Sequence, residues 1–97
     1  MRPSEALAKH REEVLEIIGR YPVSNPRVFG SVARGEDVEG SDLDILVEPQ
    51  FDVTTFVHLA ELEHDLRKLL SFEVDVVTSG GFSRRMADRV AKDVRAL

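Results

Sequence analysis

Two closely spaced aspartates stand out in the stretch from Val28 to Val47, where they precede an apolar run. Asp42 and Asp44 are separated by one residue, and side chains two positions apart in a β-strand point to the same face of the sheet. The two carboxylates can therefore converge on a metal ion in front of that face. Because the ligands are oxygen atoms and the chain has no cysteine, Mg²⁺ or Mn²⁺ is favoured over zinc.

A glycine and a serine precede the aspartates, at the end of a short apolar segment. Gly30 lets the backbone approach a bulky anion, and the hydroxyl and N–H groups from Ser31 onward can hold a phosphate. A phosphate-binding turn beside paired carboxylates is the minimum required for metal-assisted phosphoryl transfer. Two ions in such a site lie roughly 3.5–4 Å apart, one at the attacking oxygen and one at the triphosphate.

A third carboxylate is expected from a later strand, which the alternation F-E-V-D-V-V predicts over 72–77. Glu73 and Asp75 lie on the same face of that strand, so either could be the third ligand, and Asp75 is the more central. Carboxylates close together raise one another's pKa values unless a proton, an arginine or a cation compensates them. Because the strand that follows Asp42 contains no lysine or arginine, the sequence predicts a bound cation.

The order of these motifs resembles a known signature. G-S-V-A-R-G-E at 30–36, followed by S-D-L-D at 41–44 and a later carboxylate, is similar to the motif of the DNA polymerase beta-type nucleotidyltransferase superfamily. More closely, the chain resembles the minimal nucleotidyltransferase (MNT) antitoxins of HEPN–MNT toxin–antitoxin pairs, over nearly its whole length. The resemblance implies a two-layer α/β (α+β) fold, in which a small mixed sheet of three to four strands packs against helices.

The resemblance also implies an activity and a partner. MNT antitoxins of type VII toxin–antitoxin systems transfer AMP from ATP to a tyrosine hydroxyl of the HEPN toxin and so silence its ribonuclease. On that basis we expect a Mg²⁺-dependent protein adenylyltransferase that uses two ions, with Mn²⁺ as a substitute. The expected partners are ATP and a cognate HEPN toxin, joined in a hetero-oligomer.

Specific roles follow from the resemblance for the motif residues. Asp42 and Asp44 would bind both metal ions, while Asp75 would hold the catalytic ion and help to deprotonate the acceptor hydroxyl. Gly30 and Ser31 would bind the nucleotide, with Ser31 at its β- or γ-phosphate.

Arg34 and Ser41 each allow two interpretations. Arg34 matches the arginine of the family motif and could bind the nucleotide phosphate or contact the partner. A salt bridge from Arg34 to Glu36 or Asp37 is about as well supported. Ser41 could hydrogen-bond a metal-binding aspartate or cap a turn, and we favour the turn. The acidic segment 36–40 is interpreted as a solvated loop.

Two other functions are compatible with the sequence. The chain could neutralise a toxin by binding alone, or it could be a free-standing enzyme that acts on a small molecule such as an aminoglycoside. The three carboxylates favour catalysis over binding alone. Relatives that act on other acceptors carry additional domains, so in 97 residues we expect the catalytic fold, with the acceptor presented by a partner chain.

Composition supports a single domain over residues 1–97 and restricts the partners. Apolar residues make up 42% and charged residues 32% of the chain, which is enough for a core and leaves little room for disorder. The net charge of −5 argues against direct nucleic-acid binding. No apolar run could cross a bilayer and no signal-peptide core is present, so we expect no membrane partner and a cytoplasmic location.

The elements that position these residues can be inferred from apolar periodicity and turn residues. The expected helices are 4–20, 31–35, 52–70 and 82–97, and the expected strands are 27–30, 42–47 and 72–77, with a connector at 22–26. The apolar stripe of the third helix is expected to contain Phe56, Leu59, Leu62, Leu66, Leu69 and Leu70, and that of the last Phe82, Met86, Val90, Val94 and Leu97.

Overall fold

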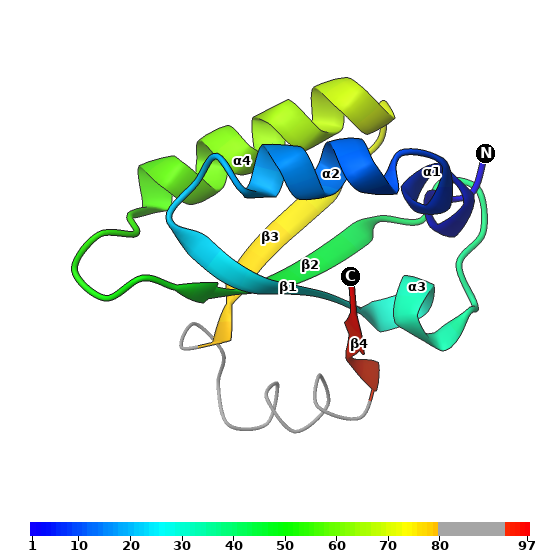
Figure 1. The fold of residues 1–97 in the computed structure, drawn as a ribbon. Coiled ribbons are helices and arrows are strands. Elements are labelled where there is room, and N and C mark those ends of the chain that lie inside the picture. Colours follow the sequence, from blue (N-terminus) through cyan, green and yellow to red (C-terminus); the bar gives the residue numbers. More distant parts are fainter. Residues whose placement is uncertain (80–92) are drawn as a thin grey trace.

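A four-stranded mixed sheet forms the centre of the protein (Figure 1). The structure is a computed structural model, and it describes residues 1–79 and 93–97. The strands are β1 (Val23–Phe29), β2 (Leu43–Pro49), β3 (Val74–Thr78) and β4 (Arg95–Ala96), in the spatial order β3-β2-β1-β4. β2 runs antiparallel to β1 and parallel to β3, and β4 pairs antiparallel with β1. The expected small mixed sheet is confirmed.

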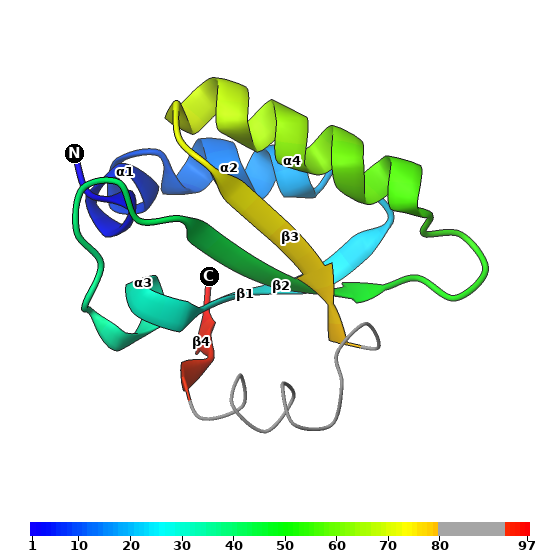
Figure 2. The ribbon, with the colours of Figure 1, turned by 180° about the vertical axis from the view of Figure 1, so that it is seen from behind.

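The described helices are α1 (Pro3–Lys9), α2 (Arg11–Ile18), α3 (Gly30–Arg34) and α4 (Phe56–Leu70). Both views show α2 and α4 side by side over one face of the sheet, so the predicted two-layer fold is confirmed (Figures 1 and 2). The short helix α3 follows β1 directly, as predicted. Within the described ranges, no helix has the length and apolar character needed to span a membrane.

The alternation of side chains along β2 separates the core from the opposite face of the sheet. Leu43, Ile45 and Val47 are fully buried and belong to the same core cluster as the leucines of α4. Because successive side chains of a strand point to opposite faces, the residue between the first two, Asp44, is placed on the face away from α2 and α4. The pattern that builds the core therefore also presents the carboxylate.

The predicted N-terminal helix over 4–20 is interrupted. His10 separates α1 from α2, with φ of −110° and ψ of 21° that lie outside the helical region. The apolar spacing continues across the break, so periodicity alone could not show it. The break turns α1 toward the loop that follows α3 (Figure 1).

The first strand is longer than predicted, and the expected connector at 22–26 was wrong. β1 begins at Val23, and its pairing with β2 contains a β-bulge between Ser24 and Arg27. Asn25 has a positive φ of 49°, and Pro26 has no N–H to donate to a ladder. Both residues are tolerated in a bulge, where the pairing of the strands is interrupted. The strand therefore continues through these turn-forming residues.

The boundaries of the next elements differ slightly from the predicted ones. β2 begins at Leu43, so Asp42 lies just before the strand, and β3 spans 74–78 instead of 72–77. α4 ends at Leu70 as predicted and starts after Thr55, whose hydroxyl caps it. Phe56 is 89% exposed, so its place in the buried stripe was wrong.

The C-terminal helix predicted over 82–97 was wrong at its end. Arg95–Ala96 form β4 at the edge of the sheet, and the Leu97 N–H donates to the Pro26 carbonyl at 3.1 Å. Leu97 is in the core cluster, where it was expected as part of a helix stripe. The remainder of that helix, with Phe82, Met86 and Val90, lies outside the described residues.

Candidate functional site

Asp44 and Asp75 lie side by side on adjacent parallel strands. They are register partners in the pairing of β2 with β3, and neighbouring strands are about 4.8 Å apart. On the other side of Asp44, the register partner is Phe29 of β1, which immediately precedes Gly30. The pairing thus brings the two carboxylates together and places the glycine–serine turn beside them.

Gly30 is in direct contact with the carboxylate of Asp44. A Cβ atom added at Gly30 would lie 2.6 Å from Asp44 Oδ2, and the φ of Gly30 is +72°. Both the close approach and the left-handed backbone require glycine. The sequence predicted an approach of the Gly30 backbone to a phosphate, and what the structure shows here is an approach to the Asp44 carboxylate.

The electrostatics of Asp44 show a carboxylate in an unfavourable place. The pKa of Asp44 is raised to about 6, chiefly by burial and further by the negative charges of Asp75 and Asp42, while Arg34 partly opposes the rise. Asp42 is exposed and lies just outside the strand, yet its charge reaches Asp44. Three carboxylates therefore share one region without enough positive charge to balance them.

Asp42, Asp44 and Asp75 do not surround a single metal position in this structure. Across residues 1–79 and 93–97, no three acidic or histidine side chains gather closely enough to hold one ion. Asp44 and Asp75 are brought together by the strand register, whereas Asp42 flanks them from the preceding loop. The donor set is entirely carboxylate oxygen, the type that hard divalent cations prefer.

Glu73, the alternative third ligand, is engaged elsewhere. Its carboxylate lies 3.4 Å from the Arg67 guanidinium, and its side chain is 67% exposed. It precedes β3 and has no register partner in β2, while Asp75 pairs directly with Asp44. The geometry favours Asp75 over Glu73 as the third member of the group.

Ser31 and Arg34 both belong to α3, the short helix that starts beside Asp44. Ser31 is partly buried in the first turn of α3, and its carbonyl accepts a hydrogen bond from the Glu36 N–H at 2.9 Å. Arg34 forms salt bridges of 3.3 Å to Glu36 and 3.3 Å to Asp93. The interpretation of Arg34 as a salt-bridge partner of Glu36 is confirmed, whereas Asp37 is not its partner.

Asp37 is a residue whose placement the sequence did not predict, because an acidic loop suggested solvent exposure. Its side chain is only 2% exposed, and its Oδ2 atom accepts a hydrogen bond from the Ser4 N–H at 2.8 Å. Burial acts to raise the pKa of Asp37, but hydrogen bonds from Ser4 and from its own backbone outweigh burial and hold the pKa below its usual value. The loop is thus fastened to α1.

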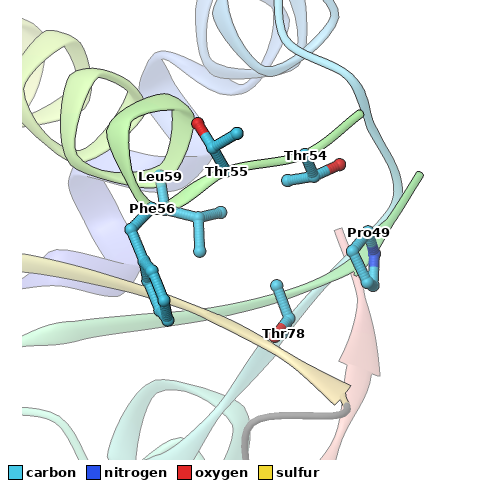
Figure 3. A pocket seen from close by; sticks show the side chains of 6 residues that line it. All are labelled: Pro49, Thr54, Thr55, Phe56, Leu59 and Thr78. Atoms are coloured by element: carbon cyan, nitrogen blue, oxygen red, sulfur yellow. The ribbon is translucent and has the colours of Figure 1, made fainter. Parts of the chain in front are cut away.

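A pocket of about 390 Å³ lies at the opposite end of β2 from Asp44 (Figure 3). It is lined by Pro49, Thr54, Thr55, Phe56, Leu59 and Thr78. None of these six side chains is charged, so the pocket offers no charged partner for a triphosphate or a cation. The charged side chains of the candidate site lie at the other end of β2, near Asp44.

Comparison with known proteins shows similarity over nearly the whole chain. A family model described as a nucleotidyltransferase domain matches residues 7–97. The protein adenylyltransferase MntA of Thermococcus cleftensis is 36% identical over 88 residues, which are 91% of this chain and 85% of the relative.

Solved structures show the same fold. A protein provisionally named as a minimal nucleotidyltransferase superimposes with a TM-score of 0.83 at 39% identity, covering 97% of this chain and 95% of the other. A chain from the complex of the tri-AMPylated Shewanella oneidensis HEPN toxin with an MNT antitoxin has a TM-score of 0.69 at 19% identity, covering 92% and 69%. At that identity the second likeness shows the fold alone.

Proposed function

Because the chain belongs to the nucleotidyltransferase domain family, and within it to the minimal nucleotidyltransferases, we propose that it is an antitoxin that adenylylates a cognate HEPN toxin. The group transferred is AMP from ATP, and the acceptor is a tyrosine hydroxyl. One observation carries the proposal: Asp44 and Asp75 lie side by side and next to the turn at Gly30. The name of the related protein adenylyltransferase supports AMP as the transferred group and a protein as the acceptor, and the choice of a tyrosine hydroxyl follows from the resemblance to the MNT antitoxins.

The reaction is a displacement at phosphorus. The tyrosine oxygen forms a bond to the α-phosphorus of ATP while the bond to the bridging oxygen breaks, and pyrophosphate leaves. Ser31 and the first N–H groups of α3 would hold the triphosphate, since the first N–H groups of a helix have no partner within it. Asp75 would accept the proton of the tyrosine hydroxyl as the new bond forms.

We also propose that Asp42, Asp44 and Asp75 hold two Mg²⁺ ions, with Mn²⁺ as a substitute. Bound there, the ions would offset the charge of the triphosphate and lower the pKa of the acceptor hydroxyl. The support is electrostatic: repulsion from Asp75 and Asp42 contributes to the raised pKa of Asp44, and a cation would relieve it.

Arg34 would complete the nucleotide site. Its positive charge is close enough to oppose the rise in the pKa of Asp44, and its side chain is 42% exposed. A phosphate group could therefore share the guanidinium with its present partners, Glu36 and Asp93.

The test is a transfer assay with the cognate HEPN toxin that the proposal requires. ATP labelled at the α-phosphate should label the toxin in the presence of Mg²⁺, whereas ATP labelled at the γ-phosphate should not. Chelation of the metal, or the substitution Asp44→Asn, should lower the rate by orders of magnitude, each tenfold being about 1.4 kcal/mol of barrier. Neutralisation of the toxin without label would indicate binding alone, and label on an aminoglycoside but not on the toxin would indicate a small-molecule enzyme.

A further inference from the structure

The loop between α3 and β2, residues 35–42, joins the two halves of the proposed site. It begins after the helix that carries Ser31 and ends at Asp42. Most of its side chains are exposed, and Glu39 and Gly40 border a hollow of about 550 Å³ between α1 and the end of α4. The loop is therefore poorly supported by packing, and its position depends on a small number of specific contacts.

Asp37 provides the buried contact of this loop. Among the described residues, Asp37 is the one charged residue that is buried. Its Oδ2 atom accepts the Ser4 N–H, while its Oδ1 atom is buried without a hydrogen-bond partner in the described part of the chain. A half-satisfied buried carboxylate lowers stability relative to a fully bonded one. The lowered pKa of Asp37 shows that the fold nevertheless favours the ionised carboxyl, so this one buried residue holds the loop against α1.

A hydrogen-bonded turn from Val38 to Ser41 connects Asp37 to Asp42. The Val38 N–H donates to Ser41 Oγ at 3.0 Å, and the Ser41 N–H donates to the Val38 carbonyl at 3.0 Å. These two bonds fix the segment between Asp37 and Ser41, and Asp42 is the next residue. They also confirm the interpretation of Ser41 as a turn residue.

The strand beyond Asp42 fixes the other side of this residue. The Leu43 N–H donates to the Glu73 carbonyl at 3.0 Å, and Leu43 is the register partner of Val74. Asp42 is thus held between the start of β2 and the turn that is anchored at Asp37.

We propose that Asp37 is a positioning residue, which holds the loop against α1 so that Asp42 faces the pair formed by Asp44 and Asp75. The inference rests on the proposed function and extends it to a residue that does not touch the substrates. The anchor works through the geometry of the hydrogen bonds that the Asp37 carboxylate accepts, chiefly from Ser4, and an amide oxygen can accept the same bonds. An amide oxygen in the same place should therefore serve, whereas a longer side chain should displace the loop.

The test compares four variants of the full chain with wild type: Asp37→Ala, Asp37→Asn, Asp37→Glu and, as a control on the same loop, Glu39→Gln. Glu39 pairs with the N-terminal amine, but its side chain is 75% exposed, so this surface pair should contribute little to the position of the loop, and Glu39 lies outside the proposed site. For each variant we would measure the melting temperature, the affinity for Mn²⁺, and kcat and KM for ATP in the transfer assay, well below the melting temperature.

Asp37→Ala and Asp37→Glu should weaken Mn²⁺ binding and lower kcat by about tenfold or more, a difference of roughly 1.4 kcal/mol. KM for ATP should change much less, because the turn at Gly30 precedes the loop. Asp37→Asn and Glu39→Gln should resemble wild type in Mn²⁺ affinity and kcat, although Asp37→Asn should melt earlier because the fold favours the ionised carboxyl. If Asp37→Ala does not fold at the assay temperature, the contrast between Asp37→Asn and Asp37→Glu decides the question.

A double-mutant comparison tests whether Asp37 acts through Asp42. In an Asp42→Asn background, adding Asp37→Ala should leave the Mn²⁺ affinity unchanged, since the positioned ligand is already lost. A full additional loss would overturn the inference, as would an Asp37→Ala protein that melts earlier but binds Mn²⁺ like wild type. The Mn²⁺ titration needs no toxin, so the inference can hold even if AMP transfer is not observed.

Discussion

Asp44 shows, at the scale of a single residue, a conflict between stability and function. It lies between buried residues of β2, faces Asp75 across the strand pair, and touches Gly30. Burial and the two neighbouring negative charges raise its pKa to about 6. A carboxylate with a pKa raised in this way destabilises the metal-free protein, and such perturbed pKa values are typical of functional sites.

Replacing Asp44 by asparagine should therefore stabilise the metal-free protein at neutral and higher pH. The pKa is higher in the folded than in the unfolded state, so the folded protein binds more protons between about pH 4 and 6 and loses stability as the pH rises through that window. Asp44→Asn should raise the free energy of unfolding by about 1–3 kcal/mol at about pH 8 and by little at about pH 4. Denaturant unfolding at both pH values checks this.

The exposed residue Glu12 on α2 offers a matched control for the pH series. Glu12→Gln should change the free energy of unfolding by little at either pH. If Asp44→Asn destabilises the metal-free protein at high pH, the carboxylate is compensated in solution and the electrostatic support for a cation is lost.

Gly30 and Gly35 allow the contact with Asp44 to be separated from backbone strain. Both have positive φ, of 72° and 71°, but an added Cβ would meet Asp44 at Gly30 and nothing within 4 Å at Gly35. Gly35→Ala should cost about 1–2 kcal/mol of stability and leave Mn²⁺ binding intact. Gly30→Ala should cost more and also impair Mn²⁺ binding, since the methyl group displaces Asp44. Chemical denaturation and Mn²⁺ titration of both variants measure the difference, and equal effects would mean that the contact with Asp44 has no role.

At the scale of elements, a hydrogen bond between Tyr21 and Asp65 joins the segment before β1 to α4. The Tyr21 hydroxyl donates to the Asp65 carboxylate, and this bond, followed by burial and the nearby charge, raises the pKa of Tyr21 to about 12. The bond helps to fix α4 over the face of the sheet opposite to Asp44.

Tyr21 is the single tyrosine of a chain without tryptophan, so its ionisation can be followed directly by ultraviolet absorbance. In wild type the phenol should ionise near pH 12, and in Asp65→Asn near its usual value of about 10. The stabilisation from the bond should be complete below about pH 10 and lost as the pH rises toward 12. Tyr21→Phe should lower the free energy of unfolding by about 0.5–1.5 kcal/mol. Ionisation of wild type near pH 10 would show that the bond is absent in solution.

The helices and strands that could be predicted correctly are those whose pattern lies within a short, continuous stretch of sequence. Alternation specified β2 and β3, and the glycine–serine turn and the apolar stripe predicted α3 and most of α4. The errors occur where distant segments decide the outcome. Pro26 lies in a strand because the Leu97 N–H and the bulge satisfy the backbone there, and Arg95–Ala96 pair with β1 instead of continuing a helix.

At the scale of the whole molecule, the same distinction applies to the site. Asp42, Asp44 and the turn at Gly30 were predicted because they lie close together in the sequence, and the β2–β3 register then placed Asp75 beside Asp44. The buried contact of Asp37 with α1 was not predictable, since it depends on a break at His10 that the apolar periodicity does not show.

The whole chain should respond to the cations that the site is proposed to hold. At a hundredfold excess of Mg²⁺ over its dissociation constant, the stabilisation should be about 2.7 kcal/mol, visible as a higher melting temperature with ATP present. Asp44→Asn should lose most of this response. A wild-type melting temperature that is indifferent to Mg²⁺ and Mn²⁺, with and without ATP, would contradict the metal site.

The most direct measurement is the mass of the HEPN toxin purified from cells that co-express it with this chain. With wild type, the toxin should be heavier by one or more AMP groups, located on tyrosine, and its ribonuclease should be silent. With Asp44→Asn the added mass should be absent and the toxin active, because the fold is retained while the chemistry is lost. A toxin that is silenced without added AMP, or silenced equally by Asp44→Asn, would contradict the proposal that this protein acts by nucleotidyl transfer.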